Sequence, residues 1–387
     1  MKILAIETSC DETAVAILEC TGDPTKGDFH MDILGNALHS QIESHKEFGG
    51  VVPMMAKREH AKNLIPLFKN ALTESGILKE NISTLHGDKI KELENIFGRE
   101  KEFLADFAKL IQSIEKPNIE AIAVTEGPGL EPALWMGIIF ARALSFVWDI
   151  PLVPVNHMEG HIMSVLPQKI NFPALSLLIS GGHTELVLMK DWYQYEIIGQ
   201  TRDDAVGEAF DKVARMLGLP YPGGPEISRL AELQRKTQTS TPEYILPRPM
   251  IHSKDFDFSF SGLKTAVLYS LKKEETPKEV VAKEFEDAVA EVLVSKTFRA
   301  IDEYNIKTLI IGGGVVSNEY IRKQFEEKVA EYSELKLLLP TPQLRTDNAL
   351  MIGLAGYLRW LKKDKKDLRN TMSDIVAVVA KGNLKLT

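Results

Sequence analysis

A series of strand-like segments followed by alternating helices and strands occurs twice along this chain, and that repetition constrains the fold more than any other feature. Short apolar runs between turn residues predict strands, and apolar residues recurring every three or four positions predict helices. Strands that alternate with helices form sheets covered by helices, which is the α/β class. The first series comprises predicted strands over residues 2–8, 13–19, 31–40 and 119–125 and predicted helices over 53–75 and 132–148.

The second series begins near Pro154. With 387 residues, the chain is long enough for two or three domains. We predict a first domain over 1–153 and a second over 154–387, with a ligand cleft between them. The sequence leaves open whether the C-terminal segment returns to the first domain. The second series comprises predicted strands over 174–180, 184–190, 194–200 and 307–311 and predicted helices over 205–217, 225–236, 261–273, 277–304, 318–330 and 346–363.

Residues 77–116 do not fit this series, because they separate a helix and a strand that a short loop would otherwise join. The segment is charged, has a helical period and carries an apolar stripe, which cannot remain in water as a contiguous patch. We therefore predict a helical pair, peripheral to the chemistry, that covers the first domain or extends a partner interface. The stripe consists of Phe103, Leu104, Phe107, Leu110, Ile111 and Ile114.

Composition favours a globular protein of a reducing compartment. Hydrophobic residues make up 44% and charged residues 26%, and the net charge of −8 argues against holding nucleic acid by bulk charge. Cys10 and Cys20 are expected at opposite ends of a hairpin, too far apart to pair. The apolar stretch from Pro132 to Trp148 is interrupted by Arg142 and falls short of the roughly 18 uninterrupted residues of a membrane span. Without a signal-peptide pattern, we expect a cytoplasmic protein with no membrane attachment.

The sharpest motif is His157-Met158-Glu159-Gly160-His161. Histidines at i and i+4 share one helical face and can meet one metal ion, although two histidines on a polar helix face would give the same spacing. Glu159 does not follow the first histidine directly, as it does in the zincin motif, so a metalloprotease is disfavoured.

Three glycine-rich turns follow strand signals, and glycine lets backbone amides approach a phosphate. None is a Walker loop or a GxGxxG motif. The turns are 180–184, 222–225 and 312–314. The polar candidates that accompany them are Asp11 and Glu12 in the first hairpin turn, Asp211, Asn318 after the third glycine turn, and Asp347 at the start of the last helix. Each polar residue also has a local interpretation, because acids are common in hairpin turns and asparagine and aspartate are common at helix N-termini.

Taken together, these motifs resemble the TsaD family of bacterial tRNA threonylcarbamoyladenosine biosynthesis transferases, a glycoprotease-like family of the actin-like ATPase superfamily. They occur in family order along almost the whole chain, whereas 77–116 has no counterpart in the family pattern and Ser228 stands where an aspartate often follows YPGGP. The matching motifs are IETSCDET, GGVVP, GPGL, HMEGH, SGGHT, GEAFDK, YPGGP, DFSFSGLKT and TDNA.

The resemblance implies an actin-like, sugar-kinase-like fold with two related domains and a central cleft. It also implies transfer of a threonylcarbamoyl group from threonylcarbamoyl-AMP to the adenosine beside the tRNA anticodon. By motif, one divalent iron or zinc ion falls on His157, His161 and Asp347, and the implied partners are a shorter paralogous subunit and a small P-loop ATPase. The substrate-binding positions fall on Leu178, Ile179, Ser180, Gly181, Gly182, Asp211, Gly224 and Asn318.

A mechanism fits these residues. The donor is a mixed anhydride, so AMP is a good leaving group, and the weakly nucleophilic adenine amine requires a polarised carbonyl and close positioning. A metal with two nitrogen ligands and one carboxylate would act as Lewis acid and template, and Asp11 or Glu12 would take the proton. The alternatives are a small-molecule kinase or ATPase of the same fold, or a non-catalytic protein that retains a nucleotide pocket.

Overall fold

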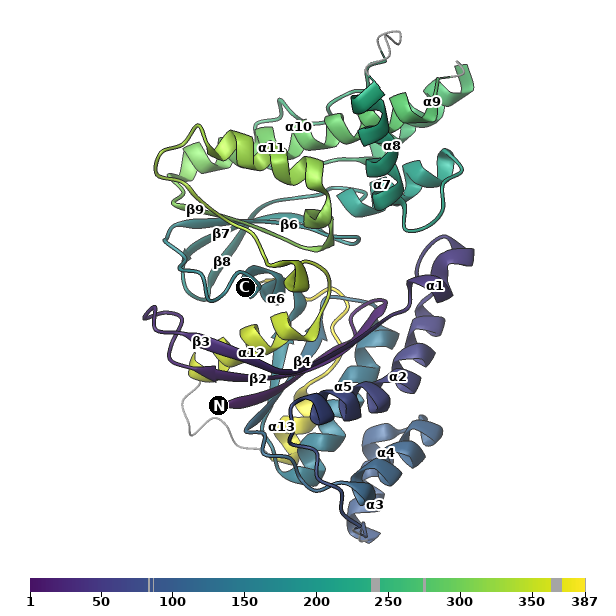
Figure 1. Ribbon diagram of the computed structural model, residues 1–387, viewed down its shortest axis with the longest axis vertical. Helices are drawn as coiled ribbons and strands as arrows, with labels where there is room; N and C mark the ends of the chain where they lie inside the picture. Colours follow the sequence, from purple (N-terminus) through teal and green to yellow (C-terminus); the bar gives the residue numbers. More distant parts are fainter. Residues whose placement is uncertain (83, 86, 238–243, 274–275, 363–370, 387) are drawn as a thin grey trace. The chain divides into compact units, whose positions relative to one another are not determined.

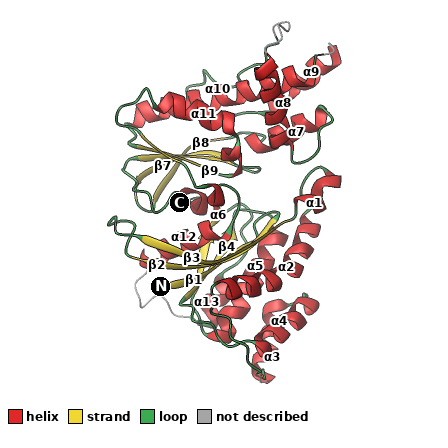
Figure 2. Ribbon diagram, viewed as in Figure 1, coloured by secondary structure: helices red, strands yellow, loops and turns green. Residues whose placement is uncertain are grey.

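The computed structural model describes residues 1–82, 84–85, 87–237, 244–273, 276–362 and 371–386. The chain packs into two compact units, each containing a five-stranded sheet covered by helices (Figures 1 and 2). The domain boundary expected at residue 153 stays a prediction, but residues 154–169 pack with the first unit. The first unit comprises Met1–Glu43, Val51–Lys169 and Asp347–Lys385, and the second comprises Ser44–Gly50, Ile170–Thr346 and Leu386.

Both sheets have the same topology. An antiparallel three-stranded meander pairs through its first strand, in parallel, with a fourth strand, which pairs in parallel with a fifth. The strand orders are β3-β2-β1-β4-β5 and β8-β7-β6-β9-β10, so the two units are related and the predicted α/β class is confirmed. The strands are β1 (Lys2–Glu7), β2 (Glu12–Thr21), β3 (His30–Ser40), β4 (Ala121–Gly127), β5 (Leu152–Asn156), β6 (Ala174–Ile179), β7 (Thr184–Asp191), β8 (Gln194–Gln200), β9 (Thr308–Gly312) and β10 (Lys336–Leu338).

Helices cover both faces of the first sheet. Side chains alternate along a strand, so Leu4 and Ile6 of β1 pack with α2 and α5, whereas α12 packs on the opposite face. Gly353 of α12 permits that contact, because a Cβ there would lie 2.1 Å from a carbon of Leu18. The helices of this unit are α2 (Pro53–Glu74), α3 (Gly87–Phe97), α4 (Lys101–Ser113), α5 (Glu131–Trp148), α6 (His157–Met163), α12 (Ala349–Lys362) and α13 (Met372–Ala377), and the short α1 (Ile42–His45) lies where the chain passes between units.

The segment at 77–116 forms the predicted helical pair, α3 and α4. Phe107 is fully buried, and its ring lies 5.3 Å from that of Phe97 and 5.9 Å from that of Phe140 on α5. Phe103 stacks on Phe140 at 6.0 Å. The apolar stripe therefore packs on its own unit.

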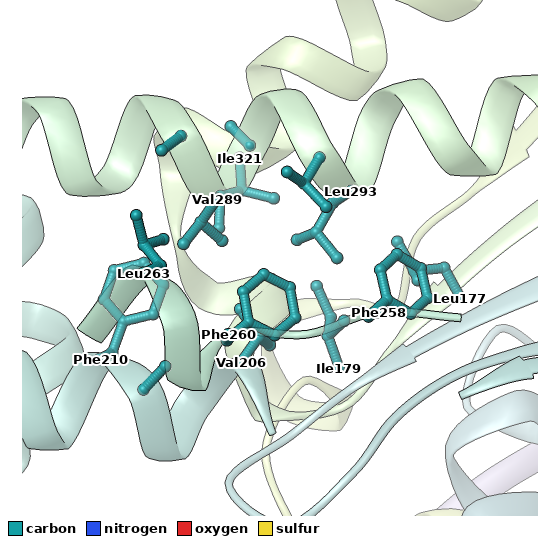
Figure 3. Packing of buried hydrophobic residues seen from close by; sticks show 14 of the residues in the cluster. Leu177, Ile179, Val206, Phe210, Phe258, Phe260, Leu263, Val289, Leu293 and Ile321 are labelled. Atoms are coloured by element: carbon teal, nitrogen blue, oxygen red, sulfur yellow. The ribbon is translucent and has the colours of Figure 1, made fainter. Parts of the chain in front are cut away.

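In the second unit, a core of phenylalanine and aliphatic side chains lies between the sheet and its helices (Figure 3). Ile179 of β6 and Phe210 of α7 belong to it, together with Leu293 of the long helix α10. The helices of this unit are α7 (Val206–Met216), α8 (Gly223–Thr237), α9 (Ser261–Lys273), α10 (Lys278–Tyr304) and α11 (Glu319–Val329).

The predicted strands and helices are found within a few residues of their expected bounds. The short helices α1 and α13 were not predicted, and neither were two strands, β5 and β10. Both are short strands at equivalent edges of the two sheets; β5 contains Pro154 and β10 has three residues. The end of the helix expected at 346–363 lies outside the described residues. Cys10 and Cys20 are free thiols. Among the described helices, none combines the length and the apolar character needed to span a membrane.

Candidate metal centre and ligand pocket

The histidine motif begins a short helix at the end of β5. Asn156 caps this helix, because its Oδ1 accepts hydrogen bonds from the backbone N–H of Met158 (2.8 Å) and Glu159 (3.4 Å). His157 therefore lies in the first turn and His161 in the next, on one helical face. Their rings lie 4.6 Å apart and nearly perpendicular.

Asp347 completes a three-residue cluster. It lies just before α12, and its Oδ1 is 3.5 Å from Nε2 of His157 and 3.2 Å from Nε2 of His161. One ligand atom from each of the three residues lies within 4.8 Å of the others. All three residues belong to the first unit, although about 190 positions of sequence separate the histidines from Asp347.

A buried carboxylate lies behind His157. Glu7, at the end of β1, is fully buried, and its Oε2 is 3.1 Å from Nδ1 of His157. The same oxygen accepts the Thr125 hydroxyl at 2.6 Å, while Oε1 accepts the backbone N–H of Ser9 at 2.5 Å. An ionised carboxylate can only accept, so Nδ1 of His157 carries a proton on the Glu7 side, and Nε2 is the nitrogen directed toward Asp347. A carboxylate in this position fixes the tautomer of a metal-binding histidine.

The pKa values of all three residues of the cluster are shifted from their ordinary values. Burial disfavours the charged imidazolium, yet Asp347 and Glu7 together raise the pKa of His157 well above its ordinary value. Burial would raise the pKa of Asp347, but the two imidazoles overcome that effect and lower it. Burial lowers the pKa of His161.

The donor set fits a divalent cation. Two imidazole nitrogens and one carboxylate oxygen suit zinc or ferrous iron and leave coordination positions for other oxygens. Both ring nitrogens of His161 are buried; within the described residues Nδ1 has no hydrogen-bond partner, and Nε2 faces the Asp347 carboxylate at 3.2 Å without the geometry of a hydrogen bond. Buried polar atoms are nearly always satisfied, so a bound cation accounts for a nitrogen that the protein leaves unpaired.

Glu159 has a different role. It is 2% exposed, and its Oε2 accepts a hydrogen bond from Nε of Arg359 at 2.5 Å; Arg359 also donates to the carbonyl of Pro154. The carboxylate is thus held by an arginine of α12, as expected if it is not the base of a metalloprotease.

The hairpin turn between β1 and β2 carries Asp11, and Glu12 is the first residue of β2. The turn is held by the fully buried His60 of α2, whose Nε2 lies 3.0 Å from the carbonyl of Cys10 and whose Nδ1 lies 2.7 Å from the Thr13 hydroxyl. Burial, with the negative charges of Asp11 and Asp347 nearby, raises the pKa of Glu12 well above its ordinary value. The turn therefore lies within electrostatic range of the metal cluster.

The second unit contains a separate pocket of about 680 Å³. Each of the three glycine-rich turns contributes a residue to its lining: Gly181, Gly224 and Gly314. Helices α8 and α11 begin at this pocket, and exposed backbone N–H groups at helix N-termini favour anions. Gly224 borders open space, because a Cβ there would meet no atom within 4 Å.

Polar groups organise the wall of this pocket. Asn318 caps α11 through the N–H of Ile321, and its Nδ2 donates to Ser228 (2.9 Å) and to the fully buried Glu286 (2.8 Å). Asn318 is thus both a cap and a pocket residue, two interpretations that the sequence left open. Glu286 also accepts from Arg235, whose guanidinium lies 3.4 Å from the ring centre of Tyr320.

The predicted substrate-binding residues divide into two groups. Gly181, Asp211, Gly224 and Asn318 line the pocket, and Asp211 accepts the backbone N–H of Gly223 at 2.7 Å. The others do not line it. Leu178 and Ile179 are fully buried in β6, Ser180 accepts the backbone N–H groups of Gly182 and His183, and Gly182 is exposed.

Sequence reasoning missed several residues of both sites. Glu7 and His60 lie in segments that look like ordinary strand and helix, and only the fold brings them to the cluster. The signal for Glu7 was a carboxylate ending an otherwise apolar strand. Arg235, Glu286 and Tyr320 follow ordinary helix patterns with no local signal.

Fold and site define a class of protein: an α/β chain of two related units, each with a five-stranded mixed sheet, with a candidate metal centre in one unit and an anion-compatible pocket in the other. The fold is similar to that in the crystal structure of T. kodakarensis HypF, with a TM-score of 0.50 and 15% identity over 70% of this chain and 44% of that one.

Sequence comparison identifies the family. The TsaD family model, described as tRNA N6-adenosine threonylcarbamoyltransferase, matches residues 32–85 and 103–354. Proteins of that name from Staphylococcus carnosus and Thermosipho africanus are each 42% identical to this chain over 372 residues, covering 95% of it and 93% and 97% of their own lengths. The chain belongs to the TsaD family and is a transferase that modifies tRNA adenosine.

The comparison corrects the expected extent of the insertion. The family match includes residues 77–85 and 103–116, so most of α4 belongs to the family pattern. Residues 86–102, which contain α3, lie outside the match.

Proposed function

We propose that the chain transfers the threonylcarbamoyl group of threonylcarbamoyl-AMP to N6 of the adenosine beside the tRNA anticodon, with a divalent iron or zinc ion on His157, His161 and Asp347. The observation that supports the metal assignment is the convergence of two buried imidazoles and a carboxylate, whose ligand atoms all lie within 4.8 Å of one another. Bound there, the ion would supply Lewis acidity to a donor oxygen.

The pocket of the second unit is proposed to hold the adenylate. Its glycine turns and two helix N-termini present backbone N–H groups suited to the phosphate. The polar wall formed by Asn318, Ser228 and Asp211 offers donors and acceptors to a ribose, and the Arg235–Tyr320 stack offers a flat surface.

In the transfer step, the N6 amine attacks the carbonyl carbon of the mixed anhydride. A C–N bond forms, the C–O bond to phosphate breaks and AMP leaves with the electron pair. The amine loses one proton, which we assign to Asp11 or Glu12 at the hairpin turn held by His60.

Partners and location follow the same proposal. A chain with a net charge of −8 lacks the excess of basic residues that phosphate contacts require. We propose that a shorter paralogous subunit and a small P-loop ATPase assist tRNA binding, and that the complex works in the cytoplasm.

The test combines donor, unmodified tRNA and purified chain, with and without these partners, and detects the modified nucleoside by mass spectrometry. Gly224→Val should weaken binding of a non-hydrolysable adenylate at least tenfold while the protein stays folded, because the side chain enters open pocket space. Gly87→Val is the matched control, since that glycine also borders open space but belongs to α3 in the first unit. ATP-dependent phosphorylation of a sugar without tRNA would instead favour the kinase alternative.

A further inference from the structure

The C-terminal residues lie against the elements that carry the metal cluster. The backbone N–H of Lys381 donates to the carbonyl of Glu126 at 2.8 Å, and its Nζ lies 2.9 Å from the Glu126 carboxylate. The N–H of Gly129 donates to the carbonyl of Gly382 at 3.1 Å. Lys381–Lys385, called the C-terminal clamp below, therefore extends along the loop that follows β4.

One connection runs from the clamp to the metal-binding helix through Asn156. This side chain is 2% exposed, and its Nδ2 donates to the carbonyl of Lys385 at 3.2 Å while its Oδ1 caps α6. With seven residues, α6 is too short to be stable by itself, so its geometry depends on its cap and its packing. The amide that holds the clamp is thus also the cap of the helix that presents both histidines.

A second connection runs through the loop after β4. The N–H of Leu130, next to Gly129, donates to the carbonyl of Ser9 at 2.8 Å, and the Ser9 hydroxyl lies 3.3 Å from Nδ1 of His157. The approach is close, since a Cβ on Gly127 would lie 2.0 Å from the carbonyl oxygen of Lys381. Two independent chains of contacts thus link the clamp to His157.

We infer that the C-terminal clamp is a positioning segment for the metal centre, acting through Asn156 and the loop after β4 to fix the orientation of His157 and His161. The inference rests on the metal site proposed above. It implies that the clamp affects the coordination geometry and the rate of metal release, beyond its effect on folding.

Two truncations differ by one residue, Lys385, whose backbone carbonyl accepts the hydrogen bond from Asn156. A chain ending at Lys385 keeps an oxygen acceptor for Asn156, and a chain ending at Leu384 lacks it, while both lose the following residues. We expect the chain ending at Leu384 to release Co²⁺ or Zn²⁺ to a chromophoric chelator about five- to tenfold faster, the effect of losing one hydrogen bond. Its Co²⁺ absorption spectrum should differ from that of the full chain, and the chain ending at Lys385 should match the full chain.

Asn156→Asp provides an independent test. The aspartate retains an oxygen to cap α6 but has no amide donor for Lys385, and its added negative charge should by itself favour a cation. Faster metal release from this variant therefore supports positioning by the clamp. Equal release rates and identical Co²⁺ spectra for both truncations and for Asn156→Asp would overturn the inference. If the full chain and His161→Ala bind metal equally, the proposed metal site itself is wrong.

Discussion

Replacing Glu7 by glutamine should weaken metal binding without removing a ligand. The backbone N–H of Ser9 needs an acceptor, so the glutamine carbonyl takes the position of Oε1 and its NH₂ takes the position of Oε2, facing Nδ1 of His157. The Thr125 hydroxyl can rotate and accept a hydrogen bond from this NH₂. Nδ1 of His157 can accept a hydrogen bond from it only if the imidazole proton moves from Nδ1 to Nε2. That tautomer blocks the nitrogen aimed at Asp347.

The expected loss of metal affinity follows from the hydrogen bond between His157 and the Glu7 carboxylate, which the substitution removes. A hydrogen bond to a charged group contributes about 1.5–3 kcal/mol, which corresponds to a change of roughly 10- to 100-fold in dissociation constant. Loss of such a partner behind a metal-binding histidine has an effect of about the same size. The assay is competition for Zn²⁺ against a chromophoric chelator, with circular dichroism to verify folding.

Two controls make the result specific. Thr125→Val removes a donor to Glu7 but keeps the carboxylate, so its effect should be smaller. Glu19→Gln removes the same charge from a partly exposed position on β2 and should leave affinity unchanged. If Glu7→Gln retains wild-type affinity, the tautomer argument fails.

Three further predictions test other parts of the molecule. Glu159→Gln should retain metal and transfer activity while lowering the free energy of unfolding by about 1–3 kcal/mol, because it weakens the bond to Arg359; loss of metal would contradict this. Phe107→Ala should cost about 3–5 kcal/mol in denaturant unfolding, with metal content unchanged if the helical pair is peripheral. Burial would raise the pKa of Asp287, but hydrogen bonds from Lys283 and Arg235 lower it overall. The ionised carboxylate therefore stabilises the fold at pH values above the unfolded pKa of about 4. This stabilisation is lost as the pH falls toward the lower pKa of the folded state. Asp287→Asn should therefore lose less stability than the wild type below about pH 4, and equal losses would refute the assignment.

The sequence predicted the elements of the fold well because its apolar periodicity matches the observed burial. Leu4 and Ile6 alternate with Ile3 and Ala5 across a sheet buried on both faces, and the regular stripe of α4 packs as expected. The strands β5 and β10 escaped prediction because three to five residues, one of them a proline, carry too little pattern.

The candidate site was predictable only where a motif concentrates its residues. His157 and His161 are four positions apart on one helix, so their spacing predicted a pair of metal ligands. Asp347 was predicted as the third ligand from the family resemblance. Glu7 and Lys385 could not be predicted, since their roles depend on contacts between distant segments. The three glycine-rich turns were individually weak signals, and the fold of the second unit brings Gly181, Gly224 and Gly314 to one pocket.

The central claim is that His157, His161 and Asp347 hold a metal ion on which threonylcarbamoyl transfer depends. The most direct measurement is the metal content of purified His161→Ala by elemental analysis, together with its transfer rate from threonylcarbamoyl-AMP to tRNA. We expect about one ion per chain in the wild type, loss of that ion from the variant, and loss of transfer with folding and adenylate binding retained. A variant that keeps one ion per chain, or that transfers at the wild-type rate without one, would contradict it.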